Sequence, residues 1–294
     1  MGPMAAWRKG DGKRSRLAWA GLSALAAVAA LAVGPARALD AAATTKFEAT
    51  YAITLAGTVI GRAAVESTFG GGTYTAKIKG STSGVSRMVT DGTAALAGDG
   101  QIAGKRVLPG SFTLDTLENG FGTHVRMAMK SGKVTDVVAE PALSKAPDRI
   151  PVTPRHKTDV VDPLSAFLVP MDRPGMPLGR QACERTIKVF DGWTRFDVEL
   201  YFKTMKAVDG GTDTYAGSVV VCGARVYPVA GHRLGGSSIA DMVDSTRSEV
   251  WLVPMKDTGL LVPYRIVMGT RWGDLTVFAT RFTARGGDQR AALQ

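Results

Sequence analysis

Alternation of apolar and polar residues is the feature of this sequence that most limits its fold. From Phe47 to Leu55 nearly every second residue is apolar, and most of the intervening residues are polar. This spacing places one face of an extended chain against a core and the other against solvent, so it predicts a half-buried β-strand. The same period recurs in segments 63–69, 74–78, 92–102, 107–116, 122–130, 186–190, 194–203, 215–227, 247–253, 262–270 and 275–282.

Glycine-rich turn sequences separate these segments. Residues 70–72 are three consecutive glycines, and turns are expected at 98–100, 118–120 and 131–132. Asp191-Gly192 favours the tight turn of a two-stranded hairpin, because glycine adopts positive φ angles without steric cost. Short strands joined by such turns indicate an antiparallel meander.

The strand count selects the fold class. An open, twisted sheet of more than about ten strands tends to curl. We therefore expect an all-β protein: a large antiparallel curled sheet, or an open or spiral β-barrel, with one short helix. An outer-membrane barrel is the competing interpretation, since its strands also alternate. The aromatic content of 7% is low for two aromatic girdles, and the proline-rich middle does not suit such a barrel.

The alternation stops between residues 140 and 162, where four prolines remove backbone donors that a strand ladder needs. This stretch predicts a connection rather than a strand. Asp162 is a good helix N-cap, and Pro163 suits the first helical position. We therefore expect a helix of two or three turns from Asp162 through Leu168, plugging one end of the β structure.

The first 38 residues have the composition of a cleavable signal helix. Basic residues crowd the first sixteen positions, an uncharged apolar run extends from Leu17 to Val33, and Ala36 and Ala38 fit the pattern that signal peptidase reads. An N-terminal membrane anchor is the alternative, although the run is short for a span of about 20 residues. Cleavage before Leu39 would leave residues 39–294 as a single β-rich domain in the periplasm, most naturally that of a Gram-negative bacterium.

The leader also explains much of the charge. Six basic residues and one acidic residue lie within it, so it carries half of the formal net charge of +10. The remaining charge is ordinary for a soluble protein of this size. It gives no reason to expect a nucleic acid partner.

Cys183 and Cys222 are the two cysteines of the chain. An even number of cysteines in an exported protein favours a disulfide. Two buried free thiols are the alternative. A metal site would need further ligands close by, and a redox pair usually has C-x-x-C spacing, which this pair lacks.

Motifs of catalysis and cofactor binding are absent from the sequence: it contains no nucleophile elbow, Walker loop, dinucleotide-binding turn or H-E-x-x-H helix. We therefore assign no catalytic residue, no metal ligand and no cofactor. A hydrolase built on the His232 loop, with Ser237 or Ser238 and Asp241, is an alternative to a simple hairpin loop. The most distinctive polar set lies in the proline-rich stretch and could bind an anionic headgroup or glycan: Lys145, Arg149, Arg155, His156 and Lys157.

Four segments carry a resemblance to a known family. They are VDPLSAFL (161–168), CERTIKVFDGWTRFDVEL (183–200), LVPYRIVMGTRWGDLTVFATRF (261–282) and YAITLAGTVIGRAAVES (51–67). Together they resemble the exported bacterial proteins grouped as domain of unknown function 3108, over roughly residues 45–283. The resemblance implies a periplasmic β-rich domain without an agreed activity, and it transfers no functional residue.

These observations favour a non-catalytic periplasmic protein that binds an envelope component, either lipid or glycan, or that supports cell-envelope integrity. The alternatives are the exported hydrolase using the His232 loop and a periplasmic carrier of lipidated cargo. The expected partner is an envelope lipid, a glycan or an envelope protein. After cleavage the protein would not be an integral membrane protein.

Overall fold

The computed structural model describes residues 44–83, 91–171, 178–211, 213–234 and 246–286, all within one compact unit that begins at Ala41. The predicted leader therefore lies outside the described residues. Strands dominate the described part. They are β1 (Thr45–Leu55), β2 (Thr58–Gly70), β3 (Thr73–Thr82), β4 (Gly92–Ala103), β5 (Arg106–Glu118), β6 (Phe121–Lys130), β7 (Lys133–Glu140), β8 (Val169–Pro170), β9 (Arg185–Phe190), β10 (Arg195–Val208), β11 (Gly217–Ala230), β12 (Glu249–Met255), β13 (Leu260–Thr270) and β14 (Gly273–Gly286).

One antiparallel sheet contains these strands, in the order β7-β6-β5-β4-β3-β2-β1-β14-β13-β12-β11-β10-β9, with β8 paired to β13. The first and last long strands, β1 and β14, pair along their length and join two meanders. Most neighbours in the sheet are also neighbours in sequence, as short glycine-containing turns require. The prediction of an all-β antiparallel sheet is confirmed.

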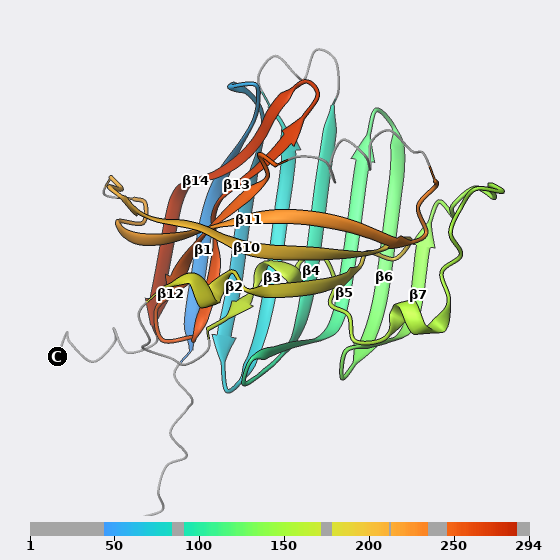
Figure 1. Ribbon diagram of the computed structural model, residues 1–294, viewed down its shortest axis with the longest axis horizontal. Helices are drawn as coiled ribbons and strands as arrows, with labels where there is room; N and C mark the ends of the chain where they lie inside the picture. The colour runs from blue at the N-terminus through green and yellow to red at the C-terminus, as the bar shows by residue number, and fades with distance from the viewer. Residues whose placement is uncertain (1–43, 84–90, 172–177, 212, 235–245, 287–294) are drawn as a thin grey trace, which may run out of the picture. The chain divides into compact units, whose positions relative to one another are not determined.

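The sheet curls so that its second half crosses its first half. Figure 1 shows β10 and β11 running across β2 to β6 at a steep angle. Direct contacts support the crossing: the indole of Trp193, in the β9–β10 turn, donates a hydrogen bond to the carbonyl of Pro141 just after β7. Tyr74 of β3 and Val219 of β11 belong to the same buried cluster. The apolar faces of the two halves thus form the interior.

Residues 158–161 link the two edges of the curled sheet. Thr158 forms an isolated antiparallel bridge with Lys133 at the start of β7, and Val161 forms a parallel bridge with Val189 of β9. These bridges satisfy part of the backbone that edge strands would otherwise leave unpaired. The proline-rich connection therefore runs along the join, and contains a 3₁₀ turn, η2 (Pro154–Lys157).

The predicted helix is wrong in length. The Asp162 carboxylate accepts hydrogen bonds from the amides of Leu164 and Ser165, as a cap would, but only Ser165–Phe167 forms a helical turn, the 3₁₀ turn η3. Leu168 is already extended, and the next two residues form β8 and pair with Leu260 and Leu261. Pairing with β13 ends the turn, because a continuing helix would remove this short strand from the sheet.

A second difference concerns the turn expected at residues 98–100. The strand β4 runs through this position, and Asp99 and Gly100 mark a shift of register against β5. The chain reverses later, at Gly104, which has a φ of 58°. Glycine at position 100 is needed for another reason, since a Cβ there would lie 2.5 Å from the carbonyl oxygen of Leu108. A glycine in a strand pattern can therefore mark a bulge rather than a turn.

Candidate functional site

The segment from Asp162 to Leu168 lies inside the curled sheet and is held by a buried polar network. The Asp162 carboxylate accepts hydrogen bonds from the backbone amides of Leu164 and Ser165, at 2.9 and 3.0 Å. The Ser165 hydroxyl donates to the other carboxylate oxygen at 2.5 Å and lies 2.6 Å from the hydroxyl of Tyr74. Because all three side chains are withdrawn from solvent, the network fixes the segment to β3.

Burial dominates the electrostatics of this network. Desolvation raises the pKa of Asp162, although the hydrogen bonds from Ser165 and from the two amides oppose it. Desolvation also raises the pKa of the Tyr74 hydroxyl. The network is therefore a structural support, with its acidic group shielded from water.

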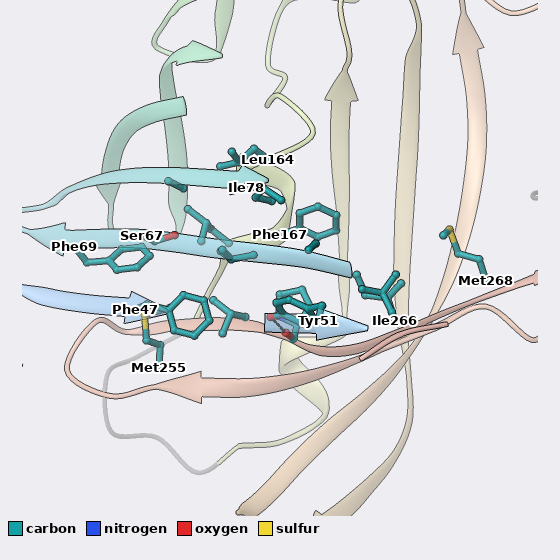
Figure 2. Close-up of a pocket in the computed structure, with 17 residues that line it drawn as sticks. Phe47, Tyr51, Ser67, Phe69, Ile78, Leu164, Phe167, Met255, Ile266 and Met268 are labelled. Carbon is teal, nitrogen blue, oxygen red and sulfur yellow. Dashed lines mark hydrogen bonds between the residues drawn. The ribbon is translucent and has the colours of Figure 1, made fainter. Parts of the chain in front are cut away.

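An apolar cavity of about 280 Å³ lies on one side of this segment. Side chains of β1, β2, β3 and β13 line it, together with Leu164, Phe167 and Leu168 of the segment. Figure 2 shows these side chains pointing into a common space. The hydroxyl of Tyr51 donates a hydrogen bond to the Pro263 carbonyl at 2.7 Å, so its polar group already has a partner within the protein. The lining is accordingly almost free of polar atoms.

A second apolar cavity, of about 250 Å³, lies on the other side and is lined by β9, β10, β11, β12 and β13. Phe167, Pro263, Ile266 and Met268 line both cavities. Phe167 is 42% exposed, although its neighbours Leu164 and Leu168 are buried. Because Phe167 lines both cavities, its exposed ring indicates space beside it that the protein's own side chains do not fill, since cores are ordinarily close-packed. Phe167 thus lies between the two cavities and lines both.

The disulfide between Cys183 and Cys222 is present and packs beside residues that line the second cavity. It ties the residue after the 3₁₀ turn η4 (Arg180–Ala182) to β11, with a Cα–Cα distance of 5.3 Å. Both cysteines are fully buried in a cluster with Leu200 and Leu252, which also line the second cavity. The predicted pairing is confirmed.

The five basic residues singled out from the sequence do not converge on these cavities. Arg149 donates to the carbonyls of Ser144 and Gly231. Arg155 contacts the ring of His156, and Lys157 lies over the ring of Phe190. Lys145 lies on the exposed surface of the same connection. An anion-binding role for this set stays a prediction.

His232 lies beside a fourth cavity, of about 320 Å³, which Asp191, Thr194 and Arg195 also line. Its proposed partners Ser237, Ser238 and Asp241 lie outside the described residues. The hydrolase hypothesis therefore stays a prediction. Among the described residues, no three histidine, cysteine, aspartate or glutamate side chains come together as a metal site would require. The described chain also has no helix with the length and apolar character needed to cross a membrane.

Sequence reasoning missed the role of Phe167. The apolar residues of segment 164–168 suggested a helical plug, and nothing in their spacing distinguished a filled interior from a hollow one. The one usable signal was the Asp162-Pro163 start, which correctly placed a cap before an apolar turn. The cavity itself depends on the distance between two sheet faces, which alternation does not specify.

Comparisons with known proteins concern the family and the fold. A solved structure similar to this chain is the crystal structure of a β-barrel-like protein of domain of unknown function DUF1849 from Brucella abortus, with a TM-score of 0.47 and 10% identity over 82% of this chain and 98% of the other. No curated protein matches the sequence. The family described as "Protein of unknown function (DUF3108)" matches residues 46–280. Because this match spans most of the sequence, the chain belongs to the DUF3108 family.

Proposed function

We propose that this protein is an exported, non-catalytic protein of the bacterial periplasm that binds the apolar chain of an envelope lipid. The observation that carries the proposal is the pair of apolar cavities on either side of Phe167. Each cavity alone is slightly smaller than the range of about 300–1,000 Å³ for small-molecule sites, but the two adjoin and share lining residues. An apolar cavity holds water poorly and readily takes an apolar ligand. A carrier of lipidated cargo would use the same space.

The lining favours lipid over glycan. Sugars are bound through many hydrogen bonds, whereas side chains such as Val65 and Met255 in the first cavity and Val198 and Leu252 in the second offer only apolar contact. Each methylene group buried in such a site contributes about 0.8 kcal/mol. A single acyl chain could therefore bind tightly without any specific polar contact.

Filling the first cavity should weaken binding. Ala63 of β2 lines this cavity, whereas Ala64 points to the exposed face of the same strand. We expect Ala63→Phe to weaken binding of the neutral fluorophore N-phenyl-1-naphthylamine by at least about tenfold, because the new ring occupies the ligand's space. Fluorescence titration of the purified protein measures this.

Ala64→Phe is the matched control, with the same change of side chain on the other face of the sheet. Its affinity should stay within about twofold of the wild type, since a surface substitution changes little. Absence of fluorophore binding by the wild-type protein would reject the proposed function. Equal binding by both variants would place the ligand elsewhere.

Removing the Phe167 side chain, which lies between the two apolar cavities, should lengthen the lipid-binding site. We expect Phe167→Ala to join the two cavities, so that the affinity for uncharged monoacylglycerols keeps rising with chain length where the wild-type affinity levels off. The measurement is displacement of the fluorophore by a series of such glycerides. Phe121→Ala is the control, because Phe121 is 81% exposed on β6 and lines neither cavity. An identical chain-length profile for the Phe167 variant and the wild type would contradict the role of Phe167 as a partition.

A further inference from the structure

The two most exposed large apolar side chains among the described residues lie at one edge of the sheet. Phe121 is 81% exposed, and Trp272 is 65% exposed. Phe121 begins β6 directly after the β5–β6 turn, and Trp272 lies in the β13–β14 turn. Leu117, near the end of β5, and Val59, near the start of β2, are also exposed at this edge. We call these four residues the apolar rim.

Strand directions place the three turns that carry the apolar rim at the same edge. Leu55, the last residue of β1, pairs with Leu275 near the start of β14, so the β1–β2 and β13–β14 turns are neighbours. Strands β1 to β5 are adjacent and antiparallel, so β5 ends at the same edge as β1. Figure 1 shows these turns along the upper edge of the sheet. The apolar rim therefore extends across several strands.

The turns hold both aromatic residues in fixed positions. The amide of Asn119 in the β5–β6 turn donates a hydrogen bond to the carbonyl of Asp91, at 3.0 Å. In the β13–β14 turn, the amide of Trp272 donates to the Thr270 hydroxyl oxygen at 3.2 Å. The Arg271 guanidinium lies over the Trp272 ring, 4.1 Å from its centre. The exposed rings thus project from ordered hairpins, and little order has to be gained when they bind a partner.

The two apolar cavities extend towards this edge. Met268 lines both cavities, and Gly269 lines the second. The strand β13 ends at the next residue, Thr270, and Trp272 is in the turn that follows. The lining of the cavities and the apolar rim are therefore close together along β13.

We propose that the apolar rim docks on the surface of a lipid bilayer, with Trp272 and Phe121 inserted at the level of the headgroups. Aromatic side chains favour this boundary between water and hydrocarbon. A protein partner would be expected to meet a contiguous apolar core, whereas these side chains project from separate turns. A bilayer surrounds every turn with the same apolar medium. The inference goes beyond the proposed function, because docking requires no ligand in the cavities.

Partition onto neutral phosphatidylcholine vesicles tests the apolar rim. The protein used spans residues 39–294, which keeps the compact unit that begins at Ala41 and omits the apolar run 17–33, since that run could bind lipid by itself. We expect Trp272→Ser and Phe121→Ser each to lower the partition coefficient by at least about fivefold, because each removes apolar surface that the bilayer would bury. The two effects should multiply in the double variant, since the turns are separate. Vesicle flotation measures the partition.

Met205→Ser is the matched control, because it also replaces an exposed apolar side chain by serine. Met205 is 37% exposed on β10, close to the β10–β11 turn. In that turn the carbonyl of Asp213 accepts a hydrogen bond from the amide of Phe282, towards the far end of β14, so the turn lies away from the apolar rim. Partition of this variant should stay within about twofold of the wild type. Wild-type binding should also persist at high salt, which screens charge attraction but not apolar insertion.

Trp272→Phe separates insertion from a folding defect. Phenylalanine keeps an apolar ring, so this variant should bind the vesicles within about threefold of the wild type. Vesicles with brominated acyl chains should quench the tryptophan fluorescence of the wild type, and most of this quenching should be lost in Trp272→Phe. Its two remaining tryptophans, Trp193 and Trp251, donate their indole N–H groups to acceptors within the protein. Melting temperatures of all variants accompany these measurements.

The outcomes separate docking from ligand binding. Absence of wild-type partition onto neutral vesicles, or equal partition by Trp272→Ser and Met205→Ser, would overturn the docking site. Binding that needs anionic lipid and disappears at high salt would assign it to the overall positive charge and refute the apolar rim. A dimer that Trp272→Ser converts to a monomer, seen by analytical ultracentrifugation without lipid, would show that the rim contacts a second copy of the chain instead. Normal vesicle partition without fluorophore binding in solution would reject the proposed function and support the docking site.

Discussion

Replacing Cys183 and Cys222 together by alanine should lower the free energy of unfolding by about 4 kcal/mol. The bond closes a loop with a sequence separation of 39, and cross-linking a loop of this size restricts the unfolded chain by about this amount. Because both cysteines are fully buried behind the second cavity, no solvent contact compensates for the loss. Denaturant unfolding followed by tryptophan fluorescence measures the change.

The reduced wild-type protein is the control for this prediction. Reduction breaks the cross-link but keeps both sulfur atoms in the core, so it separates the effect of the bond from that of the lost side-chain volume. We expect reduction to account for most of the destabilisation. An unchanged unfolding midpoint, in a sample whose two thiols are shown to be free by mass spectrometry, would contradict the stabilising role of the disulfide.

The strands and the disulfide could be predicted because each depends on a local or simple signal. Alternation from Phe47 to Leu55 identifies β1, and Asp191-Gly192 identifies the turn between β9 and β10. The pairing of Cys183 with Cys222 needed only an even count and the expectation of export. These signals act over a few residues or leave a single choice, so tertiary structure had little opportunity to override them.

The functional site could not be predicted in the same way, because it is assembled by long-range pairing. Val65 of β2 and Met255 of β12 line the same cavity only because the sheet curls. The segment after Asp162 has the sequence of a helix start, yet β13 captures Val169 and Pro170 in a strand. Alternation shows which side of a strand is apolar, but it does not show whether the two apolar faces touch or leave a cavity.

A second large loss of stability is expected when Asp162 is replaced. Asp162→Ala should destabilise the protein by about 3 kcal/mol, because the amides of Leu164 and Ser165 and the Ser165 hydroxyl then lose their acceptor in a buried site. Asp162→Asn should cost about 1 kcal/mol or less. Its amide oxygen can still accept from both backbone groups, while its nitrogen donates to Ser165 and the Ser165 hydroxyl donates to Tyr74. Thermal and denaturant unfolding of both variants test this difference.

The pH dependence of stability distinguishes the charge of Asp162 from its role as an acceptor. Burial raises the pKa of Asp162 in the folded protein, so the folded state binds its proton more tightly than the unfolded chain does. This contribution to stability is fully present below the unfolded pKa of about 3.9 and is lost as the pH rises through the folded pKa. The wild type should therefore gain stability relative to Asp162→Asn as the pH falls from neutrality. If Asp162→Asn were as unstable as Asp162→Ala, the network would require a carboxylate. If the difference in stability between the wild type and Asp162→Asn did not change with pH, this carboxylate would keep its ordinary pKa.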